Sequence, residues 1–207
     1  MTPRPGSYNP DDVRRRLRTL GNEPEIAFDR ISLEWVDELE TLRSAAVLVP
    51  LTEIDGRLSA VFTKRPETMP EHSGEVSFPG GRLDEDDENL CETALRETHE
   101  EIELRPEDVD LYGSLLRMPT VTGYDVTVFV GEFDQPYHLV ANPREIDEIF
   151  TVSLDELADP ARHRIEERSW EGESFDLHFY DYESHVIWGA TGYMVYVLLN
   201  FLTPDEE

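Results

Sequence analysis

Apolar positions in this chain form short runs typical of β-strands, separated by a few stretches with helical spacing. The expected strands cover residues 44–51, 58–63, 111–116, 126–133, 149–152 and 174–180, the last as an edge strand. The expected helices cover 11–20, 87–102, 154–158 and 191–202. Strands and helices mixed in this order predict an α/β (mixed) fold, with helices on more than one face of a sheet.

The segment 87–102 has the clearest helical pattern. Its predicted inward stripe, at positions i, i+4, i+7 and i+11, consists of Cys91, Leu95, Thr98 and Ile102. Cys91 is the only cysteine of the chain, so it has no partner for an internal disulfide. Its place in the apolar stripe indicates a packed core thiol rather than a nucleophile.

The length of 207 residues suits one buried core. We expect an N-terminal helical extension over 1–42 and one domain over 43–203. No apolar run reaches the roughly 18 residues of a membrane span, and residues 1–9 are polar and proline-rich. These features predict a soluble, cytoplasmic protein. They leave open whether it is a monomer or a homodimer.

Charge sets this chain apart, because 46 acidic residues against 18 basic ones give a net charge of -28. The acids alternate with regular apolar patterns, which favours an evenly acidic surface on a folded core over a charged tail. Such a composition resembles that of halophilic proteins, which work in molar salt; an ordinary acidic protein is the alternative. A nucleic-acid-binding surface is disfavoured, since it needs clustered Lys and Arg. We expect the one basic cluster, between Arg14 and Arg18, to pair with the protein's own acids.

Three carboxylates lie within one turn of the predicted helix 87–102. Helical spacing puts Glu97, Glu100 and Glu101 on one face, opposite the apolar stripe. This arrangement predicts a preformed divalent-cation site, because Mg²⁺ prefers hard oxygen ligands. The preceding Gly80 and Gly81 would let a phosphate or a metal approach the main chain. The alternative is a solvated acidic face, since repulsion at these spacings costs only about 0.2–0.5 kcal/mol per pair.

The same residues form a pattern that resembles the box of the Nudix hydrolase family, Gly-x5-Glu-x7-Arg-Glu-U-x-Glu-Glu-x-Gly-U, where U is apolar. The residues that match in identity are Gly81, Glu88, Arg96, Glu97, Glu100 and Glu101. Three departures occur. The loop between Gly81 and Glu88 is one residue longer, Thr98 replaces an apolar residue, and Glu103 replaces the second glycine.

This resemblance implies a Nudix fold, an α-β-α sandwich around a mixed β-sheet with a loop-helix-loop box. It also implies that Glu97, Glu100 and Glu101 bind Mg²⁺ or Mn²⁺, and that Arg96 holds a carboxylate of the box. The box does not specify the general base. Glu148 is our candidate, with Glu145 close by in sequence; otherwise both are surface acids.

Segments outside the box resemble the coenzyme A pyrophosphatase subgroup. The similarity covers Thr63 to Arg65, Gly74, Phe78 to Gly81, Val121 to Tyr124 and Trp188 to Thr191. Pro66 and Pro70 replace a small residue and an arginine of the subgroup pattern. Arg65 and Arg82 are then the remaining candidates to bind the 3′-phosphate of coenzyme A. Gly80 and Gly81 would let the diphosphate approach the main chain.

The resemblance implies metal-dependent hydrolysis of a diphosphate linkage in a small-molecule nucleotide derivative. Coenzyme A, cleaved to 3′,5′-ADP and 4′-phosphopantetheine, is the first expectation. ADP-ribose or another nucleoside diphosphate derivative is the second. A non-catalytic regulator that binds a nucleotide is the third. Neither nucleic acid nor a membrane is an expected partner.

The halophilic interpretation predicts that lowering KCl from molar to about 0.1 M unfolds the protein. The Debye length then grows from about 3 Å to about 10 Å, so the surface acids repel one another over a longer range. Divalent cations should partly restore the fold. Circular dichroism melts across a KCl series measure this effect, and a melting temperature independent of KCl would contradict the interpretation.

Overall fold

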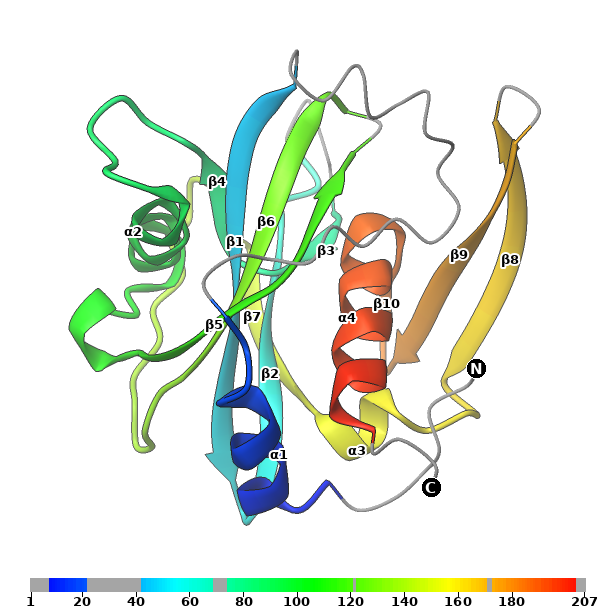
Figure 1. The fold of residues 1–207 in the computed structure, drawn as a ribbon, viewed down its shortest axis with the longest axis horizontal. Helices are drawn as coiled ribbons and strands as arrows, with labels where there is room; N and C mark the ends of the chain where they lie inside the picture. The colour runs from blue at the N-terminus through cyan, green and yellow to red at the C-terminus, as the bar shows by residue number, and fades with distance from the viewer. Residues whose placement is uncertain (1–7, 22–41, 69–73, 121, 171–172, 204–207) are drawn as a thin grey trace.

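The computed structural model describes residues 8–21, 42–68, 74–120, 122–170 and 173–203. Figure 1 shows a sheet at the centre of the molecule, with helices on both of its faces. In chain order the elements are α1 (Pro10–Leu17), β1 (Arg43–Ile54), β2 (Arg57–Lys64), β3 (Val76–Ser77), β4 (Gly80–Arg82), α2 (Leu90–Ile102), the 3-10 helix η2 (Pro106–Asp108), β5 (Asp110–Pro119), β6 (Tyr124–Glu132), β7 (Glu148–Ser153), α3 (Leu154–Leu157), β8 (His163–Trp170), β9 (Glu173–Tyr182), β10 (His185–Ile187) and α4 (Gly189–Leu202).

The main sheet is mixed and has seven strands, with β1 at its centre. β1 runs parallel to β6 and antiparallel to both β2 and β4. β5 extends the sheet beyond β6, while β3 and β7 pair with β2. The short β4 places the Gly80–Gly81 turn beside the first half of β1, where Gly80 lies opposite Val47.

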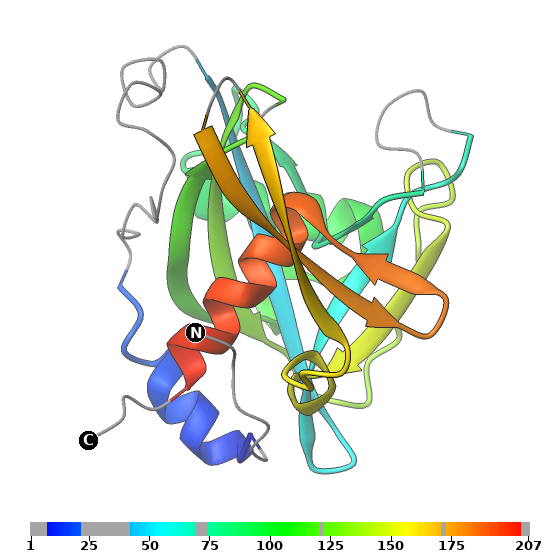
Figure 2. The same ribbon diagram turned by 90° about the vertical axis from the view of Figure 1, so that its right-hand side faces the viewer.

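Apolar side chains fill the space on both faces of this sheet. The larger core joins the sheet to α4, whose Val195, Leu198 and Leu199 are fully buried. A smaller cluster on the opposite face contains Ala94 of α2. In Figures 1 and 2, β8 and β9 cross the outer side of α4, which therefore lies between two sheets. The α-β-α arrangement around a mixed sheet is confirmed.

The helix α1 joins the larger core through Val13 and Leu17, both buried. Its Arg14 donates to the carboxylates of Glu132 and Glu53. Asn9 caps the helix by accepting from two backbone amides. The expectation that this basic segment pairs with the protein's own acids is confirmed for Arg14. In the described part of the chain, no helix is long and apolar enough to cross a membrane.

The largest difference from the predicted elements lies between residues 163 and 182. The expected edge strand 174–180 is β9, an inner strand between β8 and β10. The sequence did not indicate β8, because Ile165 is its one aliphatic side chain among charged and polar residues. All of β8 pairs with the ten-residue strand β9. Backbone hydrogen bonds to β9, rather than apolar side chains, therefore stabilise β8.

Candidate functional site

The helix α2 begins and ends with local contacts that fix its position. Asn89 accepts hydrogen bonds from the amides of Cys91 and Glu92 at the first turn. At the last turn, Glu103 takes the left-handed conformation, with φ 56° and ψ 24°. Its amide donates to the His99 carbonyl. A glycine would adopt this conformation without strain, so Glu103 ends the helix at a cost of roughly 1 kcal/mol.

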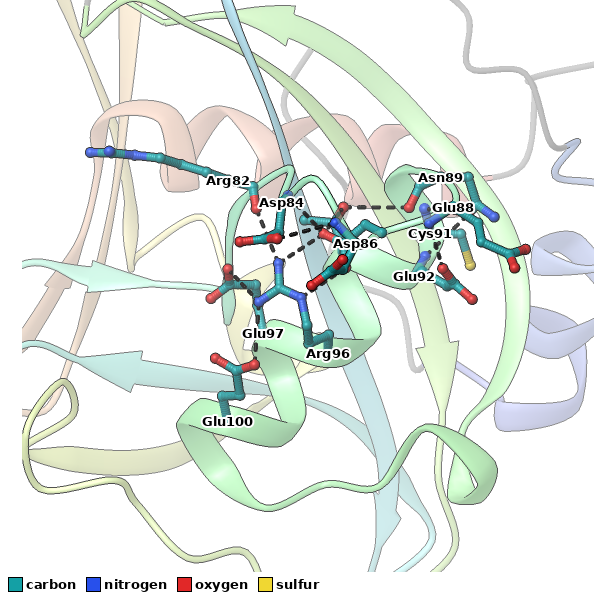
Figure 3. A network of polar contacts seen from close by, with 12 residues as sticks. Arg82, Asp84, Asp86, Glu88, Asn89, Cys91, Glu92, Arg96, Glu97 and Glu100 are labelled. Carbon is teal, nitrogen blue, oxygen red and sulfur yellow. Dashed lines mark hydrogen bonds and ion pairs between the residues drawn. The ribbon is translucent and has the colours of Figure 1, made fainter.

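An arginine clamp joins the loop before α2 to the helix itself (Figure 3). Arg96 donates through Nε to Asp87 Oδ1 at 2.8 Å and through a terminal nitrogen to Asp87 Oδ2 at 2.9 Å. The same guanidinium donates to the Arg82 carbonyl at 3.1 Å. It holds the pKa of Asp87 far below its usual range, mainly by this hydrogen bonding. A bidentate, charge-assisted pair of this kind is among the stronger contacts in proteins.

Asp87, rather than Glu88, is thus the box carboxylate that binds Arg96. Glu88 is exposed, and its backbone amide donates to Glu92 Oε2 at 2.7 Å. The extra loop residue explains the change, because five residues separate Asp87 from Gly81, the spacing that the Nudix-like pattern gives its glutamate. The identity match at Glu88 therefore did not identify the residue that performs this structural role.

The Gly80–Gly81 turn brings β4 directly against two of the three glutamates. A Cβ on Gly81 would lie 2.4 Å from the carboxyl carbon of Glu97. A Cβ on Gly80 would lie 2.4 Å from the Ala46 carbonyl oxygen, and Gly80 has φ 158°. Only glycines allow this approach of strand, helix and neighbouring backbone. The turn closes one side of the space around Glu97 and Glu101.

Glu101 is the most unusual carboxylate of the site. It is 3% exposed, and its Oε2 atom is buried without a hydrogen-bond partner in the described structure. Burial, with the nearby charges of Glu97 and Glu145, raises the pKa of Glu101 to about 8, although Arg65 and the Gly80 backbone oppose the shift. Burial also raises the pKa of Glu97, against the effect of Arg96. Such sites strongly disfavour an uncompensated negative charge.

The sequence indicated that the three glutamates share one face of the helix, opposite the apolar stripe. In the structure they do not share one solvent-facing surface. Glu101 lies with the buried face of α2, whereas the Glu100 side chain is 54% exposed. Arg96 binds Glu97 at 2.9 Å and Glu100 at 3.3 Å. Within the described ranges, no three acidic, histidine or cysteine side chains are gathered so that they could hold an ion as they stand. The three glutamates as metal ligands therefore stay a prediction, with donors on adjacent turns of α2 and two of them now bound to Arg96.

The buried face of α2 also differs from the predicted stripe. The buried side chains are Thr93, Ala94, Thr98, Glu101 and Ile102, while Cys91 and Leu95 are only partly buried. The helix is therefore rotated toward the glycine turn, and this rotation carries Glu101 inward.

The segment before β7 packs against the end of α2. The amide of Asn142 donates to the Glu101 carbonyl at 2.8 Å, and that of Val140 to the Ile102 carbonyl at 3.0 Å. These contacts place Glu145 close enough to affect the pKa of both Glu97 and Glu101.

Glu148, our candidate base from the sequence, has a different partner. Its carboxylate lies 3.0 Å from His185 Nε2, and His185 stacks on Phe150 two residues farther along β7. Phe150 packs against the larger core, on the α4 side of the sheet. Because side chains alternate along a strand, the Glu148 side chain lies on the same face as Phe150, toward α4. Ile149 packs on the opposite face, toward α2.

The two candidate substrate-binding arginines lie in different places. Arg65 lies near enough to Glu101 for its charge to lower that pKa. Arg82 contributes its carbonyl to the clamp, but its side chain points away from Glu97 and Glu100 (Figure 3). Its guanidinium lies instead over the Tyr124 ring, at 5.3 Å from the centroid. Pro70 and Val121 lie outside the described residues.

Comparison with known proteins gives a consistent family. A NUDIX domain model matches residues 42–171. Nudix hydrolase 3 of Caenorhabditis elegans is 32% identical over 215 residues, covering 96% of this chain and 88% of that protein. The protein named Uncharacterized Nudix hydrolase NudL from Photorhabdus laumondii is 35% identical over 156 residues, covering 75% and 83%. Among solved structures, a MutT/nudix family protein from Enterococcus faecalis aligns with a TM-score of 0.48 and 16% identity, over 81% of this chain and 66% of that one.

The family model covers more than half of the sequence and includes the clamp, the glycine turn and the three glutamates. The relative from Caenorhabditis elegans extends the similarity to nearly the whole chain. The mixed sheet between α2 and α4 agrees with both matches. This chain belongs to the Nudix hydrolase family.

Proposed function

We propose that the protein hydrolyses the diphosphate linkage of a nucleotide derivative, with Glu97, Glu100 and Glu101 as ligands of Mg²⁺ or Mn²⁺. The buried, unpartnered Oε2 atom of Glu101 carries this proposal. A carboxylate buried beside other acids is unstable as an anion unless a cation compensates it. The hard oxygen donors on this helix suit a small divalent ion, on which Nudix hydrolases generally depend.

Ligand binding by all three glutamates would require their present contacts to change. Glu97 and Glu100 share the Arg96 guanidinium, so they can turn inward while Asp87 keeps Arg96 in place. The bound ion would supply Lewis-acid neutralisation of charge on the diphosphate oxygens. The protein's own part is to hold the diphosphate beside the glycine turn and the glutamates of α2. Gly80 and Gly81 allow the phosphate to approach the main chain, and Arg65 offers a cation beside Glu101.

For the general base, the contacts favour Glu145 over Glu148. The segment of Glu145 is hydrogen-bonded to the end of α2, and Glu145 acts electrostatically on Glu97 and Glu101. Glu148 is held by His185, and its strand neighbours place it on the other face. A base must come within about 3 Å of the attacking water, directly or through one further water. We therefore propose Glu145 for this role, with Glu148 as the alternative.

Coenzyme A is the proposed substrate, on the strength of the segment from Thr63 to Gly81 that resembles the coenzyme A subgroup. The position of Arg65 beside Glu101 supports a role for that segment at the reacting diphosphate. ADP-ribose or another nucleoside diphosphate derivative is the second candidate, because the box itself selects only the diphosphate. A non-catalytic regulator would have no use for buried, mutually repelling carboxylates.

A substrate panel tests the proposed activity. With Mg²⁺ or Mn²⁺ we expect the protein to release 3′,5′-ADP and 4′-phosphopantetheine from coenzyme A, with a kcat/KM at least roughly tenfold above that for ADP-ribose. Mass spectrometry of products formed in ¹⁸O-labelled water identifies the attacked phosphorus. A reversed preference would establish the ADP-ribose alternative. Binding of a nucleotide without turnover of any substrate would support the third alternative, a non-catalytic regulator.

Glu101→Gln should lower kcat by orders of magnitude while stabilising the metal-free protein. Glu101 has a pKa of about 8 when folded, against 4.5 ordinarily. Its charge therefore reduces stability progressively as pH rises from about 4.5 to about 8, and has no such effect below that range. At pH 8 without divalent ions, the variant should melt at least about 3 °C higher than the parent.

Divalent ions should raise the melting temperature of the parent and not that of Glu101→Gln, because the buried charge they would compensate is gone. Glu107→Gln, which changes an exposed acid just after α2, is the matched control and should behave like the parent. An equal metal-induced shift in the parent and in Glu101→Gln would exclude Glu101 as a ligand.

Asp87→Asn and Glu88→Gln should differ sharply. The Asp87 side chain is 5% exposed and binds Arg96, so neutralising it should cost about 2–3 kcal/mol in urea unfolding. It should also lower kcat/KM at least roughly tenfold, because the clamp holds α2 against the glycine turn. Glu88→Gln should stay within about 0.5 kcal/mol of the parent. A larger effect from Glu88→Gln would show that Glu88 is the functional box carboxylate.

A further inference from the structure

Two arginines lie against one tyrosine ring beside the site. The guanidinium carbon of Arg43 is 4.3 Å from the Tyr124 ring centroid, and that of Arg82 is 5.3 Å from it. We call these three residues the Arg43–Tyr124 cluster. Both arginines are exposed, and Tyr124 is half-buried. In the part of the chain that the structure describes, the ion pairs include neither Arg43 nor Arg82.

Three adjacent strands build this cluster. Arg43 on β1 lies opposite Tyr124 on the parallel strand β6, and Ala45 on β1 lies opposite Arg82 on β4. The amide of Arg43 donates to the Gly123 carbonyl at 3.1 Å, which fixes the ends of β1 and β6 together. The small Ala45 leaves room for the Arg82 side chain to reach across β1 toward Tyr124. Sheet register therefore determines the cluster.

The cluster is one residue away from the diphosphate site. Gly81 faces Glu97, and Arg82 follows it directly in β4. Because strand side chains alternate, the Arg82 guanidinium leaves on the face opposite Glu97. Figure 3 shows the Arg82 side chain pointing away from Glu97. A ligand that contacts the main chain of Gly80 and Gly81 at β4 would thus meet a cationic side chain on the next residue of the same strand.

The charge pattern around the cluster indicates an anionic partner. The net charge is -28, and two other arginines nearby are bound to the protein's own acids: Arg117 of the main sheet to Asp125, and Arg96 of α2 to Asp87. Two guanidiniums on one ring repel each other without a carboxylate between them. A phosphate monoester would accept hydrogen bonds from both, in the planar geometry that guanidinium offers.

We propose that Arg43, Arg82 and Tyr124 form a subsite for a phosphate monoester that the nucleotide carries beside its diphosphate. This inference rests on the proposed function and narrows its substrate to nucleotides with a phosphate on the ribose. Arg43 and Arg82 bind the phosphate oxygens, and the Tyr124 ring holds both guanidiniums in place by cation–π contacts. The subsite supplies the cationic recognition that the subgroup arginine would give at Pro70.

Binding of two product-like nucleotides tests the subsite without turnover. Calorimetric titrations with 3′,5′-ADP and with 5′-AMP, at fixed salt and without divalent ions, compare ligands that differ in the second phosphate. We expect the parent to bind 3′,5′-ADP roughly ten- to a hundredfold more tightly than 5′-AMP. Arg43→Gln and Arg82→Gln should each reduce this ratio at least tenfold, mainly through weaker binding of 3′,5′-ADP.

Arg117→Gln is the matched control, because Arg117 lies on β5, which pairs with the strand of Tyr124, but is neutralised by Asp125. It should leave the ratio unchanged. A parent that does not discriminate between the ligands would overturn the proposal, as would an unchanged ratio in both cluster variants. Folding of each variant is checked by its melting temperature. The protein could fail to cleave coenzyme A and still bind 3′,5′-ADP more tightly than 5′-AMP in a way that depends on Arg43. That result would refute coenzyme A as the substrate but uphold the subsite.

Discussion

The contact between α2 and the Gly80–Gly81 turn is the constraint on which this molecule depends. It brings Glu97 and Glu101 into a space where water is largely excluded and where their charges repel each other. Glycine at both positions is a steric requirement, because a single added carbon would overlap a carboxylate or the β1 backbone. The fold thus holds an arrangement that is unfavourable without a cation, as functional sites often do.

The surrounding structure stabilises this arrangement from three directions. Ala94 and Ile102 anchor α2 in the clusters on its side of the sheet. Asp87 and Arg96 tie the helix to the preceding loop, so the helix cannot move away to relieve the repulsion. The segment 140–146 binds the carbonyls at the end of α2. Each contact is ordinary by itself, and together they hold α2 against the glycine turn before any ligand binds.

Local spacing predicted the helix, the glycine turn and the glutamates, because these features depend on residues close in sequence. Three properties depend on the fold and were not predicted. The path of the loop decides that Asp87, and not Glu88, meets Arg96. The rotation of α2 buries Glu101, and no pattern within the helix specifies it, since Thr98 and Glu101 are both polar. The proximity of Arg43 to Arg82 arises from the pairing of β1 with β4 and β6, across a long sequence separation.

Because the protein is so acidic, binding of an anionic substrate depends strongly on the few cationic side chains at this site. An acidic surface repels an anionic nucleotide at long range, so the protein gains little electrostatic steering from its overall field. In molar salt the Debye length falls to about 3 Å, which removes the repulsion and any long-range attraction alike. Recognition must then depend on contacts at hydrogen-bond distance. Bidentate guanidinium–phosphate pairs keep their geometric selectivity under such screening, whereas a diffuse positive patch does not. For an acidic Nudix hydrolase, individual arginines placed by sheet register are therefore a physically suitable way to bind a highly charged substrate.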